Sequence, residues 1–72
     1  MPSSVIRFFD YRATERALDV GFVSGRVYRY LDVPPELAAD FRAAFAKGAF
    51  FNARIRDRFA CRELKDRRGE QG

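Results

Sequence analysis

The sequence predicts an α+β fold in which a three-stranded antiparallel meander is followed by two helices packed on one face of the sheet (β-β-β-α-α). Two observations carry this prediction. Residues 18–31 alternate apolar and polar side chains with a period of two, as in a half-buried hairpin. Residues 37–45 and 51–59 instead repeat apolar side chains at helical spacing. A chain of 72 residues has room for one domain only.

The predicted hairpin can close in two registers. In the first, Ser24 and Gly25 form a two-residue turn that puts both tyrosines of the second arm, Tyr28 and Tyr30, on the polar face. Such a turn needs positive φ at both residues (type I′) or glycine at the first (type II′), and serine satisfies neither requirement well. The turn chemistry therefore weighs against this register.

In the second register the loop has three residues, 23–25, and ends with glycine in the left-handed position of a G1 bulge. This register sets Asp19 opposite Arg29, a favourable cross-strand charge pair. Turn chemistry and charge pairing agree, so we favour it. It turns Tyr28 and Tyr30 towards the core, with their hydroxyls near the rim. Its other cross-strand pairs are Phe22–Arg26, Val20–Tyr28 and Leu18–Tyr30.

Segments on both sides of the hairpin complete the first part of the fold. A first strand is predicted at 5–11 and a polar turn at 12–16. A helix begins near Pro35, because proline suits the first helical turn. We expect it to end at Lys47, with Gly48 just past its last residue. Its core-facing stripe would be Leu37, Phe41, Ala44 and Phe45.

A second helix is predicted from about Ala53 to Leu64, with Asn52 as its N-cap. The apolar series Phe51, Ile55 and Phe59 would form its buried side. Residues 65–72 contain no apolar side chain and predict a disordered polar tail. The expected domain therefore spans residues 1–64.

The net charge of +4 is unevenly distributed along the chain. Residues 1–41 hold five arginines and six acidic residues, whereas residues 42–72 hold nine basic and four acidic residues. A basic half of this kind indicates an anionic partner, nucleic acid first, although a solvated basic helix and tail would look the same. The candidate phosphate-binding side chains are Lys47, Arg54, Arg56, Arg58 and Arg62.

The aromatic pair Tyr28 and Tyr30 has two interpretations. Aromatic side chains on a sheet can stack single-stranded bases. They can equally be ordinary core residues, and the favoured hairpin register supports core packing. We therefore treat both as core aromatics.

The composition argues against catalysis and against a metal or cofactor site. The chain has no histidine and a single cysteine, Cys61, which we expect to be a small semi-buried residue. We find no paired carboxylates and no glycine-rich phosphate loop. No apolar run approaches the length that spans a bilayer, and the lone cysteine suggests a cytoplasmic setting. We expect no enzyme activity, no cofactor, no metal and no membrane partner.

The order and spacing of several short motifs resemble the KTSC domain family, over residues 3–59. The resemblance rests on five segments: Ser3-Ser4, Leu18-x-Val20-x-Phe22-x-Ser24-Gly25, Tyr28-x-Tyr30, Val33-Pro34, and Lys47-Gly48-x-x-Phe51-Asn52-x-x-Ile55-Arg56. Ala46 and Phe50 stand where the family often has serine and tyrosine. The family is named for its occurrence at the C-terminus of some lysyl-tRNA synthetases, and it also forms small bacterial and phage proteins. Its role is not established, and the resemblance implies RNA binding only by association.

Two functions of different classes follow as hypotheses. The first is a non-catalytic module that binds RNA or another nucleic acid through the basic second helix. The second is a protein-interaction or homodimerisation module that uses a sheet edge or an open sheet face. The many aromatic residues of this short chain are compatible with an exposed apolar patch.

Overall fold

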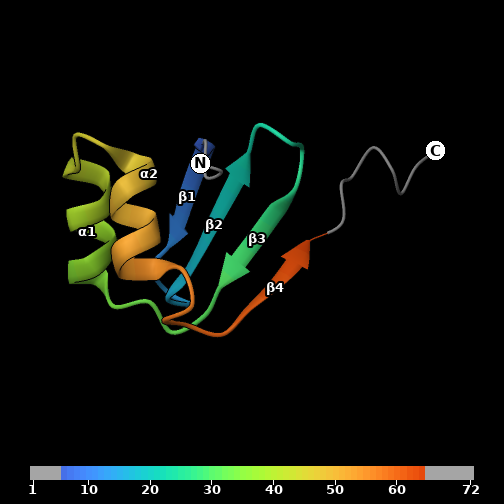
Figure 1. Ribbon diagram of the computed structural model, residues 1–72. Coiled ribbons are helices and arrows are strands. Elements are labelled where there is room, and N and C mark those ends of the chain that lie inside the picture. Colours follow the sequence, from blue (N-terminus) through green and yellow to red (C-terminus); the bar gives the residue numbers. More distant parts are fainter. Residues whose placement is uncertain (1–5, 65–72) are drawn as a thin grey trace.

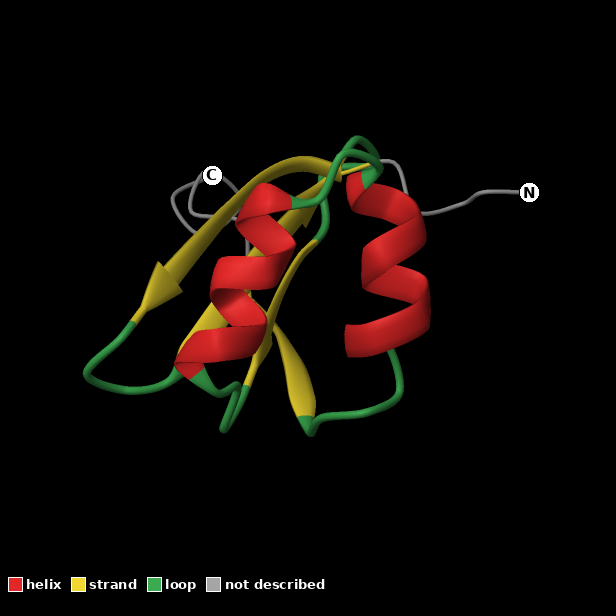
Figure 2. Ribbon diagram, turned by 90° about the vertical axis from the view of Figure 1, so that its left-hand side faces the viewer, coloured by secondary structure: helices red, strands yellow, loops and turns green. Residues whose placement is uncertain are grey.

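The computed structural model describes residues 6–64 as an antiparallel sheet with helices on one of its faces (Figures 1 and 2). The α+β class is confirmed, but the sheet has four strands rather than three. The predicted tail at 65–72 and the first residue of the predicted first strand lie outside the described residues. The strands are β1 (Ile6–Arg12), β2 (Ala17–Phe22), β3 (Val27–Tyr30) and β4 (Cys61–Leu64), in that order across the sheet.

The helical elements lie between β3 and β4 in the chain. They are α1 (Pro35–Ala43), α2 (Lys47–Phe50) and a π-helical turn, η1 (Phe51–Ile55), which continues directly from α2. Both helices lie on the same face of the sheet (Figure 2). The chain then returns to the sheet, and β4 pairs with β3 at the edge far from β1 (Figure 1).

The β2–β3 hairpin closes through the predicted three-residue loop. The backbone N–H of Gly25 donates to the carbonyl of Phe22 at 2.8 Å, and the Phe22 N–H donates to the carbonyl of Arg26 at 2.9 Å. Gly25 has a φ of 100°, the left-handed conformation that favours glycine. The predicted register is confirmed, with the pairs Leu18–Tyr30, Asp19–Arg29 and Val20–Tyr28.

The core lies between the sheet and the helices. Leu18 and Val20 point from β2 towards the helices and are completely buried. Phe41 of α1 packs against Phe9 of β1 with ring centroids 4.8 Å apart. The other core residues are Tyr30, Val33, Leu37, Ala38, Phe51 and Ile55.

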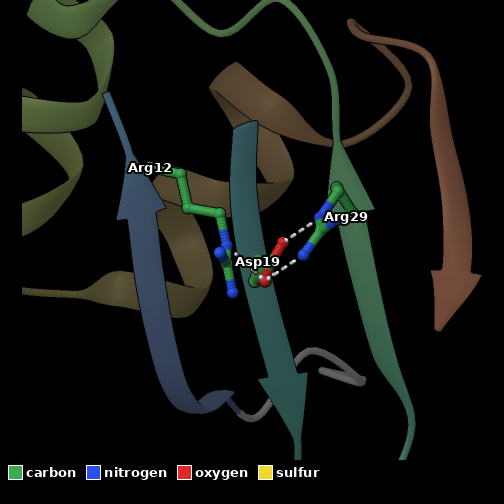
Figure 3. Close-up of polar contacts among 3 residues, drawn as sticks. All are labelled: Arg12, Asp19 and Arg29. Atoms are coloured by element: carbon green, nitrogen blue, oxygen red, sulfur yellow. Dashed lines mark hydrogen bonds and ion pairs between the residues drawn. The ribbon is translucent and has the colours of Figure 1, made fainter. Parts of the chain in front are cut away.

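Asp19 lies on the opposite face of β2 and is held between two arginines (Figure 3). Arg29 donates from Nε to Oδ1 at 2.8 Å and from Nη2 to Oδ2 at 3.1 Å, a two-pronged pair across β2 and β3. The Nε of Arg12 on β1 lies 3.5 Å from Oδ2. These contacts bury Asp19 to 6% exposure, although helices cover only the other face. One carboxylate thus ties the three N-terminal strands together.

Helix α1 begins at Pro35 as predicted but ends four residues earlier than expected, at Ala43. Ala44 has a ψ of 135°, so the chain leaves the helix before Phe45 can join the apolar stripe. The prediction that Phe45 is a core residue was wrong: its side chain is fully exposed, whereas Leu37 and Phe41 are buried. Lys47 and Gly48 begin α2 rather than ending α1.

The predicted second helix over 53–64 was also wrong. The helix starts earlier, at Lys47, so Asn52 lies within η1 and does not cap a helix. Arg56 has a ψ of 132° and Asp57 a φ of 62°, and these values end the helix where the prediction continued it. Phe51 and Ile55 are buried as expected, while Phe59 reaches the core from the turn and is half-buried.

Replacement of the Asp19 carboxylate is expected to lower stability at neutral pH. The hydrogen bonds from Arg29 are the main reason that the pKa of Asp19 lies below its usual value of 3.8. Its stabilisation is therefore complete above the unfolded-state pKa and is lost as the pH falls through the lower folded-state pKa. We expect Asp19→Asn to lower the free energy of unfolding at pH 7 by about 1.5–3 kcal/mol.

Urea unfolding from pH 7 down to pH 2 measures this effect. The difference between wild type and Asp19→Asn should shrink as the pH falls. The matched control is Asp10→Asn, which removes an exposed carboxylate directly opposite Asp19 and should be neutral or slightly stabilising. An equal loss of stability in both variants would contradict the assignment.

Two phenylalanines near each other in the chain should differ sharply in their contribution to stability. Phe51→Ala removes a buried ring and is expected to destabilise the fold by about 3–5 kcal/mol. Phe45→Ala removes a fully exposed ring and should change stability by less than about 0.5 kcal/mol. Denaturant midpoints of the two variants provide the measurement, and similar losses would disprove the described end of α1.

Candidate functional site

A cavity of about 340 Å³ opens between the β2–β3 hairpin, η1 and the start of β4. We refer to it as the tyrosine pocket. Its lining residues come from two stretches of the sequence, 22–30 and 51–61, and more than half of them are aromatic or apolar. They are Phe22, Ser24, Tyr28, Tyr30, Phe51, Arg56, Asp57, Phe59 and Cys61.

The hairpin register places both tyrosines at this pocket. Tyr28 and Tyr30 alternate with Arg29, so they share the face of β3 that looks towards the helices. Tyr30 is 6% exposed and its ring meets that of Phe51 at a centroid distance of 5.5 Å. Tyr28 is only half-buried and lies 6.0 Å from the ring of Phe22. Core packing is therefore confirmed for Tyr30, while Tyr28 divides its surface between the core and the pocket.

The hydroxyl of Tyr30 stays protonated throughout the physiological pH range. Burial is the largest cause that raises the pKa of Tyr30 to about 12, and the neighbouring Cys61 side chain contributes in the same direction. The group is therefore available as a hydrogen-bond donor and not as a base. Cys61 pairs with Tyr30 across β3 and β4. Cys61 is exposed, which contradicts the semi-buried position expected from the sequence.

The end of η1 positions a charged pair of residues at the pocket. The N–H of Arg56 donates to the carbonyl of Phe51 at 2.8 Å, a bond five residues back that defines the π-helical turn. Asp57 then adopts a left-handed conformation, which directs the chain towards β4. The guanidinium of Arg56 lies 3.4 Å from Oδ1 of Asn52 and is solvent-exposed. Such π-turns occur frequently at functional sites.

Lys47 is occupied by contacts within the domain. Its Nζ donates to the carbonyls of Ala44 at 2.6 Å and Arg42 at 3.0 Å, and it lies 5.9 Å from the centroid of the Phe9 ring. The amino group thereby satisfies carbonyls at the end of α1. Lys47 thus contacts the end of α1 and the Phe9 ring of β1.

The predicted line of arginines is divided between two surfaces. Arg54 is on η1, where its guanidinium carbon lies 5.3 Å from the centroid of the Phe50 ring, and Arg58 follows in the turn after Asp57. Both are exposed, as is Arg56. Arg62, however, is on β4 opposite Arg29 and therefore faces the other side of the sheet. Three of the five predicted basic residues therefore lie within residues 54–58, whereas Lys47 begins α2 and Arg62 lies on β4.

Sequence reasoning did not identify the pocket itself. Phe22, Ser24 and Phe59 were interpreted only as strand, turn and core positions. A continuous second helix would have carried Cys61 away from Tyr30. Among residues 6–64 the structure has no group of three potential metal ligands and no helix long and apolar enough to cross a membrane.

Comparisons with known proteins identify the family. The sequence pattern of the KTSC domain matches residues 2–59. A solved structure, a KTSC domain protein from Yersinia pestis, superposes with a TM-score of 0.79 and 34% identity, covering 90% of this chain and 94% of that one. The two structures therefore share one fold over almost their whole length.

Two sequence relatives show in what lengths of protein similar segments are found. A lysine–tRNA ligase from Nostoc punctiforme is 39% identical over 61 residues, which is 85% of this chain but 11% of that protein. An uncharacterised protein from Stutzerimonas stutzeri is 38% identical over 52 residues, covering 72% of this chain and 73% of that protein. A segment similar to this chain thus forms a small part of one relative and most of the other. It belongs to the KTSC domain family.

Proposed function

We propose that this KTSC domain is a non-catalytic module that binds single-stranded RNA. One observation carries the proposal: Arg54, Arg56 and Arg58 are all exposed between the end of η1 and the turn that follows it, and Arg56 lines the tyrosine pocket. We refer to these three residues as the basic turn. Guanidinium groups match phosphate geometry, and adjacent aromatic side chains are the usual partners of unstacked bases.

The charge state of the basic turn supports the proposal. Within residues 6–64, the ion pairs use Arg12, Arg26 and Arg29, and none of them uses a residue of the basic turn. Asp57 is the acidic residue within the turn, so the local balance is positive. Cations without carboxylate partners attract a phosphate backbone without first breaking an internal ion pair.

The relatives give independent support. One relative carries the name lysine–tRNA ligase, and the part that resembles this chain is a small fraction of its length. A small module that accompanies a tRNA-dependent enzyme is well suited to contact RNA. Nothing in that name assigns a reaction to the module, so the proposal is limited to binding.

Salt-dependent RNA binding tests the proposal. The purified protein should bind mixed-sequence single-stranded RNA in 50 mM salt, measured by fluorescence anisotropy, and lose affinity as salt rises. Arg56→Ala combined with Arg58→Ala should weaken binding roughly tenfold and reduce the slope of log K against log salt by about 1.4, since each phosphate contact on a single strand contributes roughly 0.7.

A charge-matched control separates the basic turn from net charge. Arg7→Ala combined with Arg42→Ala also removes two exposed arginines, which lie on β1 and α1. This variant should keep most of the affinity and the wild-type salt slope. Equal losses in the two double variants would reject the basic turn as the interface. Absence of binding to RNA at low salt would reject the proposed function.

A protein-interaction module is the second candidate. Phe45 favours it, because this aromatic side chain is fully exposed in the connection between α1 and α2. Self-association through the edge strand β4 is less favourable. A symmetric antiparallel pairing centred on β4 keeps each side chain on its own face, so it sets Arg62 against Arg62 or Glu63 against Glu63.

The oligomeric state distinguishes the candidates. We expect a monomer by size-exclusion chromatography with light scattering at high protein concentration. A dimer that reverts to monomer in Phe45→Ser would favour the interaction module, whereas a dimer insensitive to that substitution would require a different interface.

A further inference from the structure

We infer that the tyrosine pocket is a subsite for one unstacked nucleotide of a single-stranded RNA, with the base inside the cavity and an adjacent phosphate at Arg56. The inference rests on the proposed function and deepens it, because it says which part of the RNA the domain recognises. It rests on the shape, lining and charge of the pocket.

The walls of the pocket are suited to a planar aromatic group. Phe22 comes from β2, Tyr28 from β3 and Phe59 from the turn before β4, and all three are half-buried. Each therefore keeps part of its ring open to an incoming group. Bases stack on such rings irrespective of sequence, because every base has a π-face. The volume of about 340 Å³ is at the small end of ligand pockets, which suits one nucleotide rather than a large cofactor.

The polar groups of the pocket complement the edge and the phosphate of a nucleotide. Arg56 supplies a guanidinium for phosphate, and Asp57 supplies a carboxylate that accepts hydrogen bonds from base amino or imino groups. The hydroxyl of Ser24 can donate to base carbonyls. The pocket thus combines aromatic walls with both donors and acceptors, as base recognition requires.

Charge favours a nucleotide over an aromatic side chain of a protein partner. Arg56 lines the pocket, and Arg54 and Arg58 each lie two residues from it in the chain. A phosphodiester on each side of a bound base would meet this positive charge. A tyrosine or phenylalanine of a partner protein is neutral and would leave the arginines unused.

The geometry also resolves the two interpretations of the Tyr-x-Tyr motif. If both tyrosines had the same environment, they would either both stack on bases or both pack in the core. In the structure Tyr30 is buried against Phe51, whereas Tyr28 lines the pocket with part of its ring exposed. The motif therefore supplies one structural residue and one residue for the ligand.

An abasic oligonucleotide separates base recognition from phosphate binding. Wild-type protein should bind a fluorescein-labelled ten-nucleotide single-stranded RNA roughly tenfold more tightly than an abasic ribose-phosphate oligomer of equal length in 50 mM salt. Tyr28→Leu should abolish this preference and leave affinity for the abasic oligomer unchanged. The control Phe8→Leu alters an exposed aromatic ring on the opposite face of the sheet and should keep the preference.

The outcomes distinguish the inference from the function on which it rests. Equal, salt-dependent binding of both oligomers would overturn the nucleotide subsite and leave RNA binding standing. Failure to bind either oligomer would reject RNA binding and the subsite together. Circular dichroism and thermal melting of Tyr28→Leu verify that the variant is folded before binding is compared.

Nuclear magnetic resonance provides a second readout that needs no variant. Millimolar adenosine monophosphate should shift the amide resonances of Ser24, Tyr28, Arg56 and Cys61 before those around α1. If N-acetyltyrosine amide shifts the same resonances at lower concentration than the nucleotide does, the pocket is a peptide site and the inference is overturned.

Discussion

The register between β2 and β3 is the constraint on which the rest of the structure depends. A slip of one residue would place Leu18 and Val20 on the opposite face from the two tyrosines, so that one of these sets would leave the core. Two devices prevent it. Gly25 closes a loop of defined length, and the two hydrogen bonds from Arg29 to Asp19 form only when these residues are directly opposite.

The register of the hairpin also determines the positions of residues in the candidate site. Because Tyr30 is paired with Leu18 on one side, its other edge is available to pair with Cys61. That pairing draws β4 beside β3 and closes one wall of the tyrosine pocket. The buried Phe51 holds η1 against the same tyrosine, so the turn that carries Arg56 is anchored in the core. Scaffold and candidate site therefore share their central contacts.

The hairpin could be predicted from the sequence because its determinants are local. Turn chemistry at Ser24 and Gly25 and one charge pair were sufficient to select the register. The start of the first helix could be predicted because Pro35 acts locally. The end of that helix could not. The sequence offers no strong stop signal at Ala44, and helical periodicity continues through Phe45.

The site was harder to predict because its determinants are not local. The series Phe51, Ile55 and Phe59 fits a single long helix, and only the unpaired edge of β3 gives the chain a reason to leave it. The sequence of β4, Cys-Arg-Glu-Leu, lacks the alternation that would mark a strand. Consequently Arg62 was predicted to extend the line of Arg54 and Arg58 on one helix, whereas it lies on β4, and the pocket lined by Arg56 was missed.

A pocket with aromatic walls is costly for a domain of this size. A short chain buries a smaller fraction of its surface than a long one. Each aromatic ring that stays half-buried therefore contributes less to the free energy of unfolding than a fully buried ring would. Phe22, Tyr28 and Phe59 all remain half-buried around the same cavity. A ligand that binds only the folded state adds stability that rises with the logarithm of the ratio of ligand concentration to Kd. On this view the domain gives up some stability by leaving these aromatic rings half-buried. A ligand in the pocket would bury the rings and restore that stability.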